Sequence, residues 1–450
     1  MFMLRRRLRT VRTPSRSYPG RRRGWIFVFA VAVGVAMSCG SRSRAAERSE
    51  QAMASLSFLV LPFVNPSGDP DQNYVAVNVT SDLTARLSGL ADSVVIARSS
   101  ALTIASQSLP LPEIGRLFGV RYVLRGEAFT EGTHVHVTAT LVRAENEEPL
   151  WSERFEREFA TLWNLEREII TRIARRLDVT HADVGPHSPP EPAQDAAALD
   201  SLLRANAVAN EPTTAQTIAE ARRLFTLALR SPSRAVEAKA GLAAVHLLTA
   251  LSSRLGSASD LSQCDRLVHE ALAADPRNAR ALNTLGALRR ATGKPREALG
   301  AYEAAIAVDR NDASAHAQIG RLKVDVGEPA QALPHIELAL RLSPLDPQRP
   351  LWFTFAGLAL LHIGDPAAAR SWLEKSVAVA PQFVTSLVFL AAAQQLEGHS
   401  EDARRTIAAV QRLNPTLSVT RVEQQFAPAE RGRAEWSRIR ESLHQAGLPN

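Results

Sequence analysis

The stretch NTLGALRRATGKPREALGAYEAAIAV, residues 283–308, decides the fold because its pattern returns along the chain. Residues 317–342 read AQIGRLKVDVGEPAQALPHIELALRL, with Gly, Gly and Ala at the corresponding places 34 residues later. The small residues form three series: Gly286, Gly320, Gly357 and Ala391; Gly293, Gly327, Gly364 and Gly398; Ala298, Ala332, Ala369 and Ala403. Small side chains let two helices approach closely, so the pattern predicts pairs of helices that repeat along the chain.

A period of 34 residues with Pro at the end of a unit is the signature of the tetratricopeptide (TPR) repeat. Pro344, Pro381 and Pro415 end the last three units. Four clear units cover residues 279–417, and two degenerate units precede them, so the predicted all-α TPR solenoid covers residues 196–417. Residues 418–450 are expected to cap this solenoid, because a repeat array needs a terminal element with a polar outer face.

Residues 56–178 have a different pattern of apolar and polar residues. The apolar run LSFLVLPF predicts a buried strand, and two alternating strands joined at Glu131-Gly132 predict a hairpin. With the helical stretches among them, the expected order is β-α-β-α-β-β-β-α, which indicates a small α/β layer domain. The predicted fold is therefore an α/β layer domain followed by an all-α solenoid, and the Pro-rich residues 180–194 are expected to link the two.

Several motifs of this first domain carry a resemblance to a known family. LPFVNPSGDPDQNY, SDLTARLSGL, VVIARSS, GRLFGVRYVLRGEA and PLWSERFERE resemble the TolB-like N-terminal domain. The resemblance implies a bacterial chain, because such domains precede TPR repeats in many bacterial regulators, including some adenylate cyclases and winged-helix proteins. Those domains often carry acidic pairs in the first helix, and this sequence keeps only Asp82 of them.

Residues 1–39 have the layout of an export signal or membrane anchor. Nine arginines and no acidic residue lie within residues 1–24, and the apolar run WIFVFAVAVGVAM follows. That run has 13 residues, so as a helix it spans about 20 Å, less than a hydrocarbon core of about 30 Å. VAMSCGS, residues 35–41, resembles a bacterial lipoprotein cleavage box, which implies Cys39 as the residue that carries the lipid. Lipidation of Cys39, plain cleavage, an uncleaved anchor and a true start at Met53 are the alternatives, and the expected location is the bacterial cell envelope, membrane-anchored or periplasmic.

Charge and motifs restrict the class of function. The net charge is +7, and removing the nine arginines of the leader leaves −2 (7 − 9), so no nucleic-acid partner is predicted. The sequence contains no HExxH, GxSxG, CxxC or P-loop pattern, and His134 and His136 are expected to face solvent from one strand. We therefore predict no enzyme activity, no cofactor and no metal site.

The repeats predict a peptide-binding groove. In a TPR unit the first helix lines the concave face, and its second, fifth, ninth and twelfth positions face inward. Counted from Ala279, Ala313, Pro350 and Val384, these positions give Arg280, Asn283, Arg290, Arg321, Leu351, Leu358, Leu361 and Val388. Guanidinium pairs well with carboxylate, so the expected ligand is an extended or helical segment with an acidic part and an apolar part.

The predicted function is a non-enzymatic scaffold or sensor that binds protein or peptide partners, because repeat solenoids bind along a concave face. The membrane is the other expected partner, through residues 1–39. The alternative is a regulatory component of a signalling system that acts on a separate effector, such as a cyclase, a kinase or a transcription factor, as the resemblance implies. A third hypothesis, an enzyme without a recognisable motif, would need a cluster of polar side chains in a deep pocket.

Overall fold

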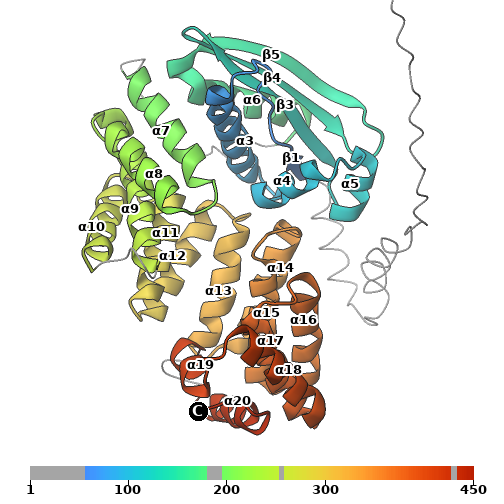
Figure 1. Cartoon of the computed structure of the whole chain (residues 1–450). Coiled ribbons are helices and arrows are strands. Elements are labelled where there is room, and N and C mark those ends of the chain that lie inside the picture. Colours follow the sequence, from blue (N-terminus) through green and yellow to red (C-terminus); the bar gives the residue numbers. More distant parts are fainter. Residues whose placement is uncertain (1–55, 180–194, 253–257, 427–432) are drawn as a thin grey trace, which may run out of the picture. The chain divides into compact units, whose positions relative to one another are not determined.

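The computed structural model describes residues 56–179, 195–252, 258–426 and 433–450 (Figure 1). Residues 53–450 form one compact unit. The predicted export segment 1–39, which includes Cys39, and the predicted linker 180–194 lie outside the described residues. No helix within the described ranges is long and apolar enough to span a membrane.

The first domain is built on a five-stranded mixed sheet in the order β2-β1-β3-β4-β5 (Figure 1). The strands are β1 (Ser57–Val60), β2 (Val94–Val95), β3 (Tyr122–Glu131), β4 (His134–Arg143) and β5 (Pro149–Glu158). β1 pairs in parallel with β2 and β3, because helices carry the chain from one of these strands to the next. β3, β4 and β5 pair antiparallel, since short turns join them.

Helices cover both faces of this sheet. α3 (Asn73–Ser88) and α6 (Leu162–Arg176) bury apolar side chains such as Leu83 and Ile169 in one cluster with one face of the strands. α4 (Arg98–Ser106) and α5 (Leu111–Phe118) contribute Ile104 and Ile114 to a second cluster with Val123. The expected α/β layer domain is confirmed, and α4 is a helix that the sequence analysis omitted.

The second part is a run of paired helices (Figure 1). Its helices are α7 (Ala196–Ala209), α8 (Ala215–Ala228), α9 (Ala235–Leu251), α10 (Ala258–Ala274), α11 (Ala279–Ala291), α12 (Pro295–Val308), α13 (Ala313–Asp325), α14 (Ala332–Leu342), α15 (Arg349–Ile363), α16 (Pro366–Val379), α17 (Val384–Leu396) and α18 (Ser400–Leu413). Each helix packs on the next one along the chain, and α7 also packs on α9, α9 on α11, α13 on α15 and α15 on α17. The expected TPR-like array is confirmed. Helices α19 (Val419–Phe426) and α20 (Arg433–Gln445) follow it.

The two glycine series of the sequence have different structural reasons. Gly293, Gly327, Gly364 and Gly398 have φ of 73°, 81°, 90° and 87°. This left-handed conformation favours Gly and turns the chain after the first helix of each unit. Gly286, Gly320 and Gly357 lie inside first helices, where an added Cβ would meet Tyr302, Ile336 and Leu373 of the second helices at 2.7, 2.5 and 2.5 Å. One series thus permits the turn and the other permits the close packing of the pair.

Buried hydrogen bonds join the sheet domain to the helices. In α3, Nδ2 of Asn78 donates to the carbonyl oxygen of Leu203 in α7 (2.8 Å). Asn311, between α12 and α13, accepts from the backbone N–H of Val95 (3.3 Å) and donates to the carbonyl oxygen of Ser93 (3.2 Å). Since the edge of a sheet exposes unpaired backbone groups, Asn311 satisfies groups that β2 leaves open.

Candidate peptide-binding groove

The predicted groove residues all lie on the first helices of the units, but they differ in exposure. Helix α11 carries Arg280, Asn283 and Arg290, of which both arginines are exposed; we call this set the open end. Helices α13, α15 and α17 carry the remaining residues: Arg321, Leu351, Leu358, Leu361 and Val388. All of these are buried except Leu351, which is half-buried; we call this set the closed end.

Arg280 stands beside a hollow in the N-terminal part of the array. A cavity of about 250 Å³ is lined by residues of α7, α8 and α9, by residues between α7 and α8, and by Arg280. Its apolar lining includes Ile218, Phe225 and Val245, and the Arg280 guanidinium lies 6.0 Å from the centroid of the Phe225 ring. Nη1 of Arg280 donates to Oδ1 of Asn206 (2.7 Å). The hollow therefore offers a cation next to an apolar surface.

A second cavity of about 310 Å³ shares Arg280 and Asn206 with the first one. Its charged lining residues have both signs: Arg86, Arg277 and Arg280 against Asp82, Glu237 and Asp309. Burial, together with the nearby Asp312 carboxylate, raises the pKa of Asp309 to about 6. The first cavity is also lined by charges of both signs, Arg280 and Glu211, and Arg280 is set apart there by its place beside the Phe225 ring.

A buried acid that the sequence analysis missed lies beside two residues of the second cavity. Glu166 of α6 is fully buried, and its Oε2 lies 3.6 Å from Nε of Arg86. Burial and the neighbouring Asp82 carboxylate raise the pKa of Glu166 well above its usual range. The sequence did carry a signal: Glu166 follows Leu162 by four residues and precedes Ile169 by three, which places it on the apolar face of a helix.

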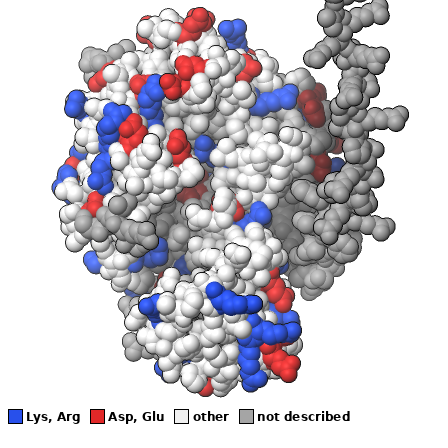
Figure 2. Space-filling view, viewed as in Figure 1, with Lys and Arg blue, Asp and Glu red and all other residues white. Residues whose placement is uncertain are grey.

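The other two residues of the open end are placed close to polar partners. Nδ2 of Asn283 donates to Oδ2 of Asp312 (2.6 Å). Arg290 is exposed and lies near the hydroxyl of Tyr302, whose pKa is raised by burial to about 12. On the face drawn in Figure 2, Lys and Arg side chains lie among Asp and Glu side chains. Arg280 is the arginine that lines the first cavity, where its guanidinium lies beside the Phe225 ring.

Arg321 of the closed end is used within the chain. It is buried at 7% exposure, and its Nη1 forms an ion pair with Oδ1 of Asp325 one turn later. Its guanidinium also lies 5.6 Å from the centroid of the Phe426 ring in α19. Its charge is therefore already paired in this structure.

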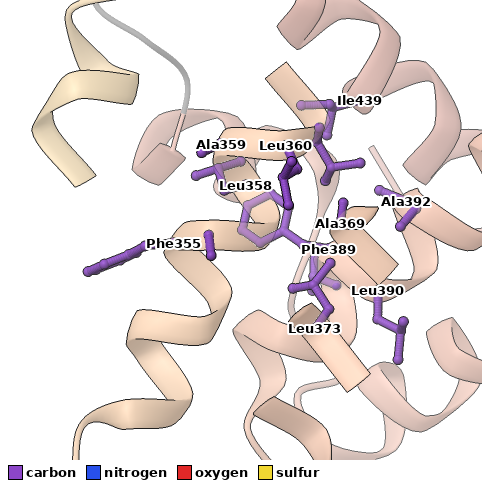
Figure 3. Close-up of a cluster of buried hydrophobic side chains, with 14 of the residues drawn as sticks. Phe355, Leu358, Ala359, Leu360, Ala369, Leu373, Phe389, Leu390, Ala392 and Ile439 are labelled. Carbon is purple, nitrogen blue, oxygen red and sulfur yellow. The ribbon is translucent and has the colours of Figure 1, made fainter. Parts of the chain in front are cut away.

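The apolar residues of the closed end share a hydrophobic cluster with the C-terminal helix. Leu358, Leu361 and Val388 belong to one buried cluster with the α20 residues Trp436 and Ile439. Helix α20 packs on α17 and on α15, and Figure 3 shows Ile439 in the cluster with side chains of both helices. The chain's own C-terminal helix thus packs on two of the helices that were expected to contact a ligand.

The next question is where the structure places possible metal ligands, the thiol of Cys264 and the two strand histidines. Within the parts of the chain that the structure describes, no group of three or more His, Cys, Asp or Glu could hold a metal ion. Cys264 is fully buried, and burial raises the pKa of its thiol to about 12. The expectation that both strand histidines face solvent holds for His134 and is wrong for His136, which is 7% exposed because its ring stacks on Phe129 (centroids 5.0 Å apart).

Comparison with known proteins places the chain beside one curated relative and several solved structures. No protein-family model matches it. It is 29% identical over 233 residues to the "Putative adenylate cyclase 3" of Rhizobium meliloti (strain 1021), which covers 51% of this chain and 40% of that protein. The chain therefore spans less than half the length of this relative.

The solved structures are similar to the chain at low sequence identity. Pseudomonas aeruginosa PilF is 20% identical, with a TM-score of 0.41, over 51% of this chain and 96% of that one. YrrB, named as a TPR protein with an unusual peptide-binding site, is 20% identical, with a TM-score of 0.33, over 42% of this chain and 90% of that one.

Proposed function

We propose that this chain is a non-enzymatic scaffold or sensor that binds protein or peptide partners through the groove of its TPR-like array. The observation that carries the proposal is the open end, where Arg280 borders a cavity with Phe225 in its lining. A guanidinium recognises a carboxylate through paired hydrogen bonds, and an apolar hollow takes an apolar side chain. The proposed ligand is a peptide segment in which an acidic residue lies close to an apolar one.

The proposal includes a location and a family for the rest of the chain. Residues 1–39 export the protein or tether it to the cell envelope, with Cys39 as the lipid acceptor in the tethered form. The sheet domain is a TolB-like domain that senses a signal or docks a partner. The motifs of residues 56–178 and the basic, then apolar, composition of the leader support these two assignments.

The test of the open end compares two peptides and two variants of the full chain. The probe is a fluorescein-labelled synthetic 12-residue peptide of Leu and Glu, and its control has Gln in place of Glu. A hydrogen bond to a charged group contributes about 1.5–3 kcal/mol, which corresponds to about 10- to 100-fold in Kd. Arg280→Gln is therefore expected to weaken binding of the Glu peptide by at least about 10-fold, as measured by fluorescence anisotropy.

The matched control is Arg404→Gln, which removes one exposed arginine from α18. It is expected to bind the Glu peptide as the wild type does, and added salt is expected to weaken both by screening the carboxylate. Equal affinity of the Arg280→Gln and Arg404→Gln proteins for the Glu peptide contradicts the proposal. Equal affinity of the wild type for the Glu and Gln peptides also contradicts it.

A second candidate function is a regulatory component of a signalling system that acts on a separate cyclase, kinase or transcription factor. The similarity to a protein named as a putative adenylate cyclase supports it. Both functions use the array to bind a partner, and they differ in whether that partner is an effector. A cyclase, kinase or transcription factor encoded beside this chain and retained on the purified protein favours the second.

A further inference from the structure

Helix α20 is amphipathic, and its apolar stripe faces the array. Trp436, Ile439 and Leu443 follow one another at steps of three and four residues and are buried to 3% exposure or less. Outside this stripe, Arg440 at its border and Glu441 on the opposite side are exposed. This spacing is that of a helix which lays one face into a groove.

The surface beneath α20 consists of the helices that the repeat pattern assigns to the ligand. Helix α20 packs on α15 and α17, both first helices of TPR-like units. Its buried side chains share a cluster with Leu358, Leu361 and Val388, three residues of the closed end. The place where a TPR array receives a partner is therefore filled here by the array's own chain.

The contact between α20 and this surface leaves two buried polar atoms without a hydrogen-bond partner. Under α20, Nε1 of Trp436 and Nε2 of His362 are buried without a hydrogen-bond partner, and the two rings stack with centroids 6.3 Å apart. An unsatisfied buried polar group costs about 1–3 kcal/mol, so α20 binds its groove below the affinity that the groove allows.

We propose that α15 and α17 form a binding groove for an amphipathic helix, and that α20 occupies this groove in cis until a partner helix of the same apolar spacing displaces it. The partner is a protein helix with aromatic and aliphatic residues at positions i, i+3 and i+7, as in Trp436, Ile439 and Leu443. This inference deepens the proposed function, since it names the partner of the closed end, and it does not involve Arg280.

The test asks whether the groove accepts α20 in trans. The probe is a labelled synthetic peptide of residues 433–450, RAEWSRIRESLHQAGLPN. A tethered helix has an effective concentration of about 1 mM. For a groove that binds the free peptide with a Kd of about 10 μM, the tethered helix therefore weakens the apparent affinity for that peptide by about 100-fold. The full-chain variant Ile439→Asp with Leu443→Asp releases α20 and is expected to bind the peptide about 100-fold more tightly than the wild type does.

Two controls define the site. Arg440→Gln alters an exposed residue of the same helix outside the buried stripe, and this variant is expected to bind the peptide as weakly as the wild type does. A peptide that itself carries Asp at positions 439 and 443 is expected not to bind the released groove. If the folded double variant binds the probe no better than the wild type does, α20 is a permanent part of the fold and the inference is wrong.

Hydrogen exchange of the wild type gives a second measurement that needs no variant. Displacement requires α20 to open while α15 and α17 stay folded, so its amides are expected to exchange through local opening, faster than those of α17. Exchange of α20 and α17 at the same rate, through global unfolding, overturns the inference even if the double variant fails to fold. The acidic Leu-Glu peptide tests the open end separately, so failure of one proposal is distinguishable from failure of the other.

Discussion

Gly357 tests whether close helix packing, and not helix propensity, determines the glycines of the repeat. In the substitution Gly357→Ala, the new Cβ would lie 2.5 Å from Cγ of Leu373 and 2.9 and 3.0 Å from its two methyl carbons. Leu373 is fully buried, so its side chain has no open space to enter. Overpacking of a core costs about 1–3 kcal/mol, whereas Ala gains at most about 1 kcal/mol over Gly in a helix.

Because the close contact involves a branched carbon of a buried side chain, the cost is expected at the upper end of that range. The net effect of Gly357→Ala is then a loss of about 1–2 kcal/mol in the free energy of unfolding. For an array of about 200 residues this lowers Tm by about 2–8 °C. Thermal melting followed by far-UV circular dichroism measures the shift.

Gly300→Ala is the matched control, since it makes the same chemical change in a helix of the same array. Gly300 is exposed on α12, and an added Cβ there meets no atom within 4 Å. The propensity gain of up to about 1 kcal/mol remains unopposed, so this variant is expected to raise Tm. If Gly357→Ala raises Tm as much as Gly300→Ala does, Leu373 accommodates the methyl group and the packing argument fails.

Two further predictions concern pH and the leader. Burial lowers the pKa of His362 to about 4. As the pH falls below about 6.5, the unfolded chain therefore binds the proton first, and the native state loses about 2 kcal/mol by pH 5. His362→Phe removes this proton-binding site. The free energy of unfolding of the variant relative to the wild type is therefore expected to rise by about 2 kcal/mol between pH 7 and pH 5. A difference between the two proteins that does not change with pH refutes this prediction. In cells fed a clickable fatty acid, the wild type is expected to be labelled and the Cys39→Ser variant is expected not to be. Equal labelling of the two proteins contradicts the lipidation of Cys39.

The repeated part of the fold could be predicted from the sequence because its physical causes are local. A left-handed turn at Gly293 and a close approach at Gly286 each require glycine at a fixed distance along the chain. The left-handed turn returns in all four clear units, and the close approach has Gly in three of them and the small residue Ala391 in the fourth, so the period of about 34 residues is visible without any knowledge of distant contacts. Helix α4 lacked such a signal: its N-cap residue, Ala97, makes no side-chain cap hydrogen bond, and the segment SSALTIAS begins with residues typical of turns.

The rest depended on contacts between residues far apart in the sequence. His136 lies on the polar side of its strand by period, yet Phe129 on the neighbouring strand covers its ring. The position of Arg321 was likewise predicted to face the groove, but the sequence does not show that Phe426 and Asp325 engage it. Residues 418–450 were predicted to cap the array, and the sequence does not show that α20 packs on α15 and α17.

The two ends of the groove impose different conditions on a ligand. At the open end, Arg280 already donates to Asn206, so a carboxylate has only to add to that contact beside an existing cavity. At the closed end, a ligand must replace the buried stripe of α20, whose tether gives it an effective concentration of about 1 mM. An acidic peptide is therefore expected to bind without moving α20. A partner that joins an acidic segment to an amphipathic helix gains an anchor at Arg280 first, and this anchor raises the local concentration of its helix against that of α20.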